Sequence, residues 1–161
     1  MDLQIIQNRI IEVRGQRVML DVHLAELYEV ETKVLKQSVR RNLDRFPEDF
    51  MFELTNNEYE ELRSQTVTSY WKSVNYTPFA FTEQGVAMLS SVLKSKRAIQ
   101  VNVEIMRAFV LIRKLTLQNS EIIHRIDEME KKYDDQFSEV FSAIRYLINP
   151  PQTERRKIGY K

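Results

Sequence analysis

The sequence predicts an α+β protein that is predominantly helical, and three observations support this prediction. Apolar residues recur mostly at spacings of three or four, whereas runs that alternate as a strand does are few and short. No proline occurs between Pro78 and Pro150, which leaves room for one long C-terminal helix. The 161 residues are 43% hydrophobic and 29% charged, an ordinary globular composition. The length suits one compact domain and an appendage.

The N-terminal third predicts a hairpin followed by two consecutive helices. Residues 10–20 form two β-rich runs bent at Gly15, a residue that readily adopts the positive φ of a turn. Asp21 is expected to cap a short helix that ends at Tyr28. Thr32 is expected to cap a longer helix over residues 33–45, which Pro47 ends. A helix, a tight turn and a longer helix form a helix-turn-helix-like head.

The rest of the head predicts short wing-like strands that alternate with helices. The expected order is a strand over 50–54, a helix over 58–65 capped by Thr55, a Ser/Thr/Tyr-rich loop over 64–78, a strand over 79–81, a helix capped by Thr82, and a helix that begins after Ser95. We divide the chain into the head at residues 1–112, a coiled-coil helix at 113–149 and a short basic tail at 150–161.

Apolar residues in the C-terminal part fit a heptad repeat. Beyond Tyr133 a competing stripe begins at Phe137, a four-residue slip that locally unwinds a coiled coil. Asn119 at an a position favours a parallel two-stranded homodimer, although the same stripe also suits a helix that folds back on the head. The residues expected at the oligomer seam are Leu115, Asn119, Ile122, Ile126, Met129, Tyr133 and Val140.

The helix over 33–45 carries the strongest chemical signal. It contains five basic residues and one acidic residue, a net charge of +4 in a chain whose total is +1. Its spacing places Val34, Leu35, Val39, Leu43 and Phe46 on an apolar face opposite the cations. Cations displace counterions from the DNA backbone, and Lys, Arg and Gln donate hydrogen bonds to base edges in the major groove. The candidate DNA-binding residues are Lys33, Lys36, Gln37, Arg40, Arg41 and Arg45, with Arg14 and Arg17 at the hairpin as secondary candidates.

Two alternatives stay open for these charges. A solvated helix face of mixed charge is the commonest explanation of such spacing. Arg14 and Arg17 are equally typical of a charged strand edge that discourages aggregation.

The loop before residue 79 contains three aromatic residues, Tyr70, Trp71 and Tyr76. They are compatible with stacking on bases, but aromatic residues of this kind more often cover a core.

Several separated motifs, in order, resemble the ORF6N domain family. These are RVMLD at residues 17–21, LAELY at 24–28, RFPEDFMF at 45–52, AFTEQGVAML at 80–89 and AIQVNVEIMRAF at 98–109. The resemblance implies a module related to the KilA-N and Bro-N domains, which serve as the DNA-binding part of antirepressor-like regulators in phages and large DNA viruses. Relatives tend to have a Gly-rich basic segment before the AFTEQG motif, whereas this chain has SYWKSVNYTP at residues 69–78.

An enzymatic function is not expected. The chain has no cysteine, and its two histidines, His23 and His124, lie far apart outside any metal-binding or nucleophilic motif. His23 with Glu26 has the spacing of a metal-binding pair, but a partly buried, hydrogen-bonded histidine is the more common state. The acidic residues Glu48, Asp49, Glu53 and Glu58 leave a carboxylate nuclease as an alternative. Neither a metal nor an organic cofactor is implied.

These observations predict a cytoplasmic, bacterial regulator that binds double-stranded DNA through the helix over 33–45. No segment resembles a secretion signal or a membrane span. Absence of cysteine suits a reducing compartment. The alternative is an interaction module, as in an antirepressor, that binds another phage or host regulator and needs no DNA contact.

Overall fold

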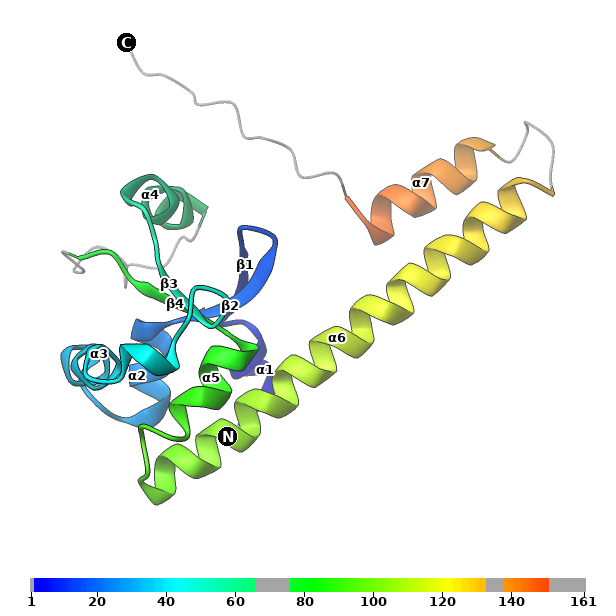
Figure 1. The fold of residues 1–161 in the computed structure, drawn as a ribbon. Helices are drawn as coiled ribbons and strands as arrows, with labels where there is room; N and C mark the ends of the chain where they lie inside the picture. The colour runs from blue at the N-terminus through cyan, green and yellow to red at the C-terminus, as the bar shows by residue number, and fades with distance from the viewer. Residues whose placement is uncertain (1, 66–75, 133–137, 151–161) are drawn as a thin grey trace, which may run out of the picture. The chain divides into compact units, whose positions relative to one another are not determined.

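The computed structural model describes residues 2–65, 76–132 and 138–150 (Figure 1). It confirms the predicted class, because a small antiparallel sheet lies among helices that make up most of the chain. The chain divides into two compact units, Met1–Leu111 and Ile112–Lys161. Tyr70, Trp71, Tyr133 and the tail from residue 151 onward, for which sequence-based predictions were made, lie outside the described residues.

The first unit is built on a four-stranded antiparallel sheet with the order β1-β2-β4-β3. Its strands are β1 (Ile10–Val13), β2 (Gln16–Leu20), β3 (Met51–Glu53) and β4 (Phe79–Thr82). The predicted hairpin is confirmed, because Val13 pairs with Gln16 across a two-residue turn. Both turn residues, Arg14 and Gly15, have positive φ, at 54° and 71°, as a type I′ turn requires.

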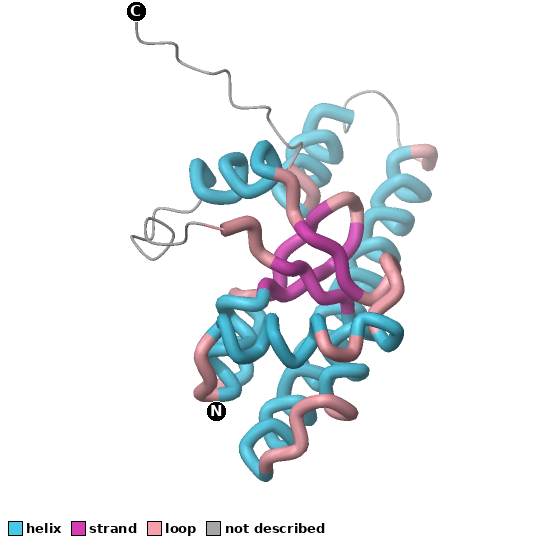
Figure 2. The backbone as a smooth tube through the Cα atoms, turned by 60° about the vertical axis from the view of Figure 1, so that its left-hand side comes forward, coloured by secondary structure: helices cyan, strands magenta, loops and turns pink. Residues whose placement is uncertain are grey.

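Helices cover both faces of this sheet (Figure 2). Because side chains alternate along a strand, Met19 and Phe81 enter one apolar cluster while Val18 and Ala80 enter another. The larger cluster also takes side chains from α1, α2, α3, α5 and α6, and the smaller one includes Tyr59 of α4. The helical segments are α1 (Leu3–Gln7), α2 (Asp21–Tyr28), α3 (Thr32–Arg40), the 3₁₀ turn η1 (Leu43–Arg45), α4 (Asn56–Gln65), α5 (Glu83–Leu89), α6 (Lys96–Glu130) and α7 (Ser138–Ile148).

Side-chain caps hold the starts of three helices where the sequence predicts them. Thr55 and Glu58 form a reciprocal capping box: the Glu58 N–H donates to Thr55 Oγ1, and the Thr55 N–H donates to Glu58 Oε2. Thr82 Oγ1 accepts from the Gly85 N–H, and Ser95 Oγ accepts from the Ala98 N–H. These hydrogen bonds satisfy backbone N–H groups that have no partner within the helix.

The caps predicted for the helix pair are wrong. The N-cap residue of α2 is Leu20 and that of α3 is Glu31, and neither makes a side-chain cap. Asp21 and Thr32 are instead the first residues of their helices. The Asp21 carboxylate turns into the protein, where its Oδ2 atom accepts a hydrogen bond from the Phe79 N–H. A tertiary partner has therefore replaced the local one.

Gly85 is required by close packing between α5 and the segment before β3. A Cβ atom at this position would lie 2.0 Å from the backbone oxygen of Phe50. That oxygen also accepts from the Thr82 N–H, so it cannot move away without loss of this hydrogen bond. The glycine in the AFTEQG motif therefore permits close contact between two backbone segments.

The second unit differs from the predicted continuous helix over residues 113–149. Helix α6 ends at Glu130, and a separate helix, α7, begins at Ser138. Arg145 of α7 forms ion pairs with Asp127 and Glu130 near the end of α6. These contacts are possible only because the chain reverses between the two helices. The second apolar stripe in the sequence therefore marks a new helix.

The reversal changes which apolar side chains of the second unit are accessible. Ile126 on α6 and Phe141 on α7 are buried, each 9% exposed. Ile126 is therefore unavailable to the predicted oligomer seam, and this prediction is wrong for that residue. Four other predicted seam residues are exposed hydrophobics, and Asn119 is exposed as well: the four are Leu115, Ile122, Met129 and Val140.

Candidate nucleic-acid interface

Helices α2 and α3 follow each other across a tight turn. Glu29 ends α2 in the left-handed conformation, with φ 59° and ψ 42°. The following Val30 N–H donates to the Ala25 oxygen at 2.9 Å, which closes the end of the helix as in a Schellman motif. Leu24 of α2 and Leu35 of α3 are fully buried in the same cluster. The predicted helix-turn-helix-like pair is thus present.

The outer face of α3 carries cationic and amide side chains. Lys33, Gln37, Arg40 and Arg41 are all exposed. Their spacing of four, three and one residues keeps them on one side of the helix. The nine residues of α3 include no acid, so nothing on the helix neutralises this charge. We call these four residues the basic face of α3.

Helix α3 is shorter than predicted, because it ends at Arg40. Arg41 is its C-cap, and Leu43–Arg45 form the 3₁₀ turn η1. The Asn42 side chain donates to the Ser38 oxygen at 2.8 Å, so it bonds a carbonyl near the helix end. Arg45 is exposed, but it lies on η1 and not on the basic face.

The predicted apolar face of this segment is only partly buried. Leu35, Val39 and Phe46 are buried as expected, whereas Val34 is 46% exposed and Leu43 is 53% exposed. For Leu43 the cause is the end of α3, because the helical periodicity used to place it does not continue past Arg40. Val34 instead lies beside Lys33 at the exposed start of the helix.

Lys36 contradicts the sequence-based prediction most clearly. It is 6% exposed and is therefore no direct contact for DNA. Its Nζ atom donates to the backbone oxygen of Thr77 at 2.9 Å and lies 3.5 Å from Asp21 Oδ2. The centres of the Tyr76 and Phe79 rings lie 4.3 Å and 4.0 Å from the same atom. Spacing alone placed Lys36 with the exposed cations, whereas tertiary packing turns it inward.

The environment of this ion pair shifts both of its ionisable groups. Burial raises the pKa of the Asp21 carboxyl, and the Phe79 N–H and the Lys36 ammonium partly oppose this shift. Burial likewise lowers the pKa of Lys36, and the charge of Asp21 opposes that shift. The pair joins the first residue of α2, the middle of α3 and the start of β4. Lys36 and Asp21 therefore position the basic face and do not form part of it.

Sequence inspection missed the role of Asp21, because an aspartate before a helix is typical of a local cap. One signal was available. Lys36 follows Leu35 on the side of α3 that carries Val39, and a cation beside the apolar stripe of an amphipathic helix often needs a buried acidic partner.

The two arginines of the hairpin are both engaged within the chain. Arg14 Nε donates to Glu58 Oε1 at 2.7 Å, and its guanidinium lies 4.4 Å from the centre of the Phe52 ring. This hydrogen bond, together with those from Thr55, lowers the pKa of Glu58 to about 2. Arg17 on β2 is partly buried and also interacts within the chain. Both side chains thus have structural partners.

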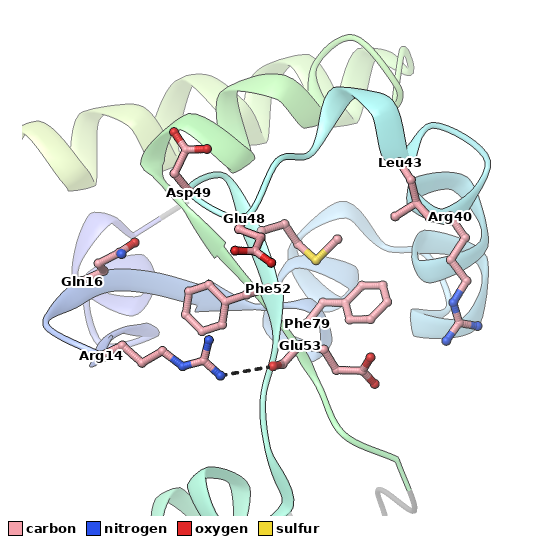
Figure 3. A pocket seen from close by; sticks show the side chains of 10 residues that line it. Arg14, Gln16, Arg40, Leu43, Glu48, Asp49, Phe52, Glu53 and Phe79 are labelled. Atoms are coloured by element: carbon pink, nitrogen blue, oxygen red, sulfur yellow. Dashed lines mark hydrogen bonds between the residues drawn. The ribbon is translucent and has the colours of Figure 1, made fainter.

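A cleft of about 700 Å³ lies beside the C-terminal end of α3 (Figure 3). Arg40 extends into it, and its guanidinium lies 5.6 Å from the centre of the Phe79 ring. Arg14 and Gln16 line the opposite side in this view, with Glu48 above β3. Two arginines of the predicted DNA-binding set therefore line one cleft that also contains carboxylates.

The histidines and carboxylates form no metal site in the described residues, where no group of three or more His, Asp or Glu side chains is arranged to hold a cation. His23 on α2 is largely buried, and burial with the nearby charge of Arg9 lowers its pKa to about 4. Glu58 serves as a cap and an ion-pair partner. Glu53 accepts a hydrogen bond from Thr77.

Comparisons with known proteins give one match. Residues 8–92 match the ORF6N domain, which is more than half of the chain and includes the hairpin, the helix pair, the sheet and α5. No curated protein and no solved structure matches the chain. Among the described residues, no helix is long and apolar enough to cross a membrane. The match indicates a regulatory domain of the phage type and confirms the resemblance seen in the sequence: the chain belongs to the ORF6N domain family.

Proposed function

We propose that this protein is a non-catalytic regulator, of phage or mobile-element type, that binds double-stranded DNA through the basic face of α3. The observation that carries the proposal is the exposure of Lys33, Gln37, Arg40 and Arg41 on a helix without acidic residues. Such a helix, held as the second of a closely connected pair, suits insertion into the major groove.

The residues of the basic face have two roles in this proposal. Lys33 lies at the N-terminal end of α3, which enters the groove first, and Gln37 lies about one turn further along the same side; both donate to base edges. Arg40 and Arg41 lie at its C-terminal end and neutralise phosphates, with support from Arg45 on η1. Val34, exposed beside Lys33, is suited to contact with a thymine methyl group.

The buried pair beneath α3 supports this assignment indirectly. Lys36 fixes the rotation of α3 about its own axis, because its ammonium is held by Asp21 and by the Thr77 oxygen. A recognition helix needs such support, since side chains read bases only within narrow limits of distance and angle. Loss of Lys36 is therefore expected to impair binding through α3 orientation and stability.

Charge reversal on the basic face tests the proposal. The Lys33→Glu, Arg41→Glu double variant is compared with a Lys94→Glu, Lys96→Glu control, which makes the same charge change at exposed residues before and at the start of α6. Fluorescence anisotropy with random duplex DNA at low salt should show affinity reduced by about a hundredfold in the first variant. The control should lose far less. Equal losses in both variants would mean that only total charge matters.

We further propose that the chain forms a homodimer through its second unit. Leu115, Ile122, Met129 and Val140 are between 45% and 55% exposed there, and such side chains gain from burial against a second copy. Sedimentation equilibrium of the Leu115→Ser, Ile122→Ser variant beside the unchanged chain tests this point. A monomer in the variant and a dimer in the parent chain are expected, whereas a parent chain that is monomeric at all concentrations would exclude the dimer.

A further inference from the structure

The sheet has an open edge at β3, and the cleft of Figure 3 lies along this edge. We propose that this cleft binds an extended, basic segment of a partner protein, which adds to the sheet as a further strand next to β3. Arg40 is the only residue that this surface shares with the basic face of α3, and the proposal does not depend on DNA binding.

The hydrogen-bond register shows which backbone groups β3 offers. The Thr82 N–H donates to the Phe50 oxygen, and the Leu54 N–H donates to the Pro78 oxygen. Phe50, Phe52 and Leu54 therefore direct their backbone groups toward β4, because hydrogen-bonded residues alternate along an antiparallel strand. The backbone groups of Met51 and Glu53 accordingly point to the open edge.

Contacts within the chain already use two of the four backbone groups of Met51 and Glu53 that point to the open edge. The Met51 N–H donates a hydrogen bond to the Pro47 oxygen at 3.0 Å. The Glu53 oxygen accepts a long contact of 3.5 Å from Arg14 Nη2. The Met51 oxygen and the Glu53 N–H remain directed outward by the alternation, two residues apart, as an acceptor and a donor for an added strand.

The two walls of the cleft suit the alternating side chains of such a strand. In Figure 3, Arg14, Gln16 and Phe52 lie on one side of β3, and Arg40 and Leu43 lie on the other. Leu43 is 53% exposed, an apolar contact with little cover from its own chain. A strand with one apolar face would place its apolar residues against Leu43.

The charges of the cleft distinguish a protein segment from a nucleic acid. Glu48, Asp49 and Glu53 line it, and neither Glu48 nor Asp49 forms a salt bridge with any residue that the structure describes. The guanidinium of Arg14 is already bound to both oxygens of Glu58. The three carboxylates face two arginines, Arg14 and Arg40, and Glu58 already neutralises Arg14. The remaining charge of the cleft is negative, so it attracts Lys or Arg more than phosphates, and a basic peptide fits this site.

The probe for this proposal is a fluorescein-labelled, acetylated (Lys-Val)4 peptide, titrated against the full chain. It is compared with (Glu-Val)4 and with a (Lys-Val)4 peptide N-methylated at every residue, which has no backbone N–H left for strand pairing on either edge. The test variant is Glu48→Gln, Asp49→Asn. The control is Glu12→Gln, Glu61→Gln, the same loss of charge at exposed positions on β1 and α4.

Binding of (Lys-Val)4 is expected to weaken about tenfold in the test variant and to stay unchanged in the control. Neither (Glu-Val)4 nor the N-methylated peptide should bind comparably. Affinity for duplex DNA should not fall in the test variant, which separates this site from the basic face of α3. Absence of peptide binding, equal binding of the N-methylated peptide, or an unchanged affinity in the test variant would overturn the proposal. A loss of DNA affinity there would assign the cleft to the DNA contact and also overturn it.

Discussion

The ammonium of Lys36 and the carboxylate of Asp21 form an ion pair, 3.5 Å apart, in the interior of the first unit. Their side chains are 7% and 0% exposed, so solvent screens this pair little. The same ammonium lies over the ring of Phe79 in a cation–π contact, and the Phe79 N–H donates to Asp21 Oδ2, the oxygen that faces Lys36. This arrangement connects the helix pair to the sheet, and its loss should therefore affect both fold and function.

Replacement of Lys36 by methionine should destabilise the first unit strongly. The change leaves Asp21 buried without its counter-charge, which costs roughly 3–5 kcal/mol when one member of a buried pair is removed. Lys33→Met, on the exposed face of α3, should change the free energy of unfolding by less than about 0.5 kcal/mol. Urea unfolding followed by circular dichroism measures both. Similar stability in the two variants would show that the pair does not hold α3.

Gly85→Ala should also destabilise the fold. The added methyl group would lie 2.0 Å from the Phe50 oxygen, so α5 or the segment before β3 must move, at a cost of about 3 kcal/mol or more. Gly15→Ala provides the contrast, because a Cβ atom there meets nothing within 4 Å. Only the strain of positive φ applies at that position, about 1–2 kcal/mol. Thermal unfolding of the two variants should therefore rank Gly85→Ala as the less stable.

Stability should fall as the pH drops from about 6.5 to about 4. The pKa of His23 is lowered to about 4 in the folded chain, so the unfolded chain binds more protons throughout this window. The contribution of His23 to the free energy of unfolding is therefore fully present above pH 6.5 and is lost toward pH 4, and it amounts to at most about 3 kcal/mol. His23→Gln should flatten this slope in urea unfolding, whereas His124→Gln, at an exposed position of α6, should leave it unchanged. Parallel slopes in all three proteins would exclude His23 as the cause.

The salt dependence of DNA binding should separate the phosphate contacts from the base contacts. Arg41→Gln and Arg45→Gln should each reduce the slope of log K against log salt by about 0.9, because each removes one phosphate contact. Gln37→Ala should leave the slope unchanged and reduce discrimination between a selected site and random DNA. Slopes that stay constant in all three variants would place the phosphate contacts elsewhere.

Periodicity and local chemistry were sufficient to predict much of this fold. The hairpin at Gly15, the helix pair and the caps at Thr55 and Thr82 depend on residues close together in the chain, so their signals are local. The family resemblance rests on the same short motifs, and the match to residues 8–92 confirms it. The exposed positions of Lys33, Gln37, Arg40 and Arg41 also follow from spacing on a single helix.

Tertiary packing decided the remaining features. Spacing shows which residues share one side of a helix, but it cannot show how wide a strip of the helix the rest of the protein covers, and that width puts Lys36 inside and leaves Val34 outside. Asp21 looked like a cap because its partners, Phe79 and Lys36, are distant in the chain. Arg145 meets Asp127 and Glu130 only after the chain reverses direction between α6 and α7. Each of these outcomes depends on contacts between residues far apart in sequence, whose free energy outweighs local preference.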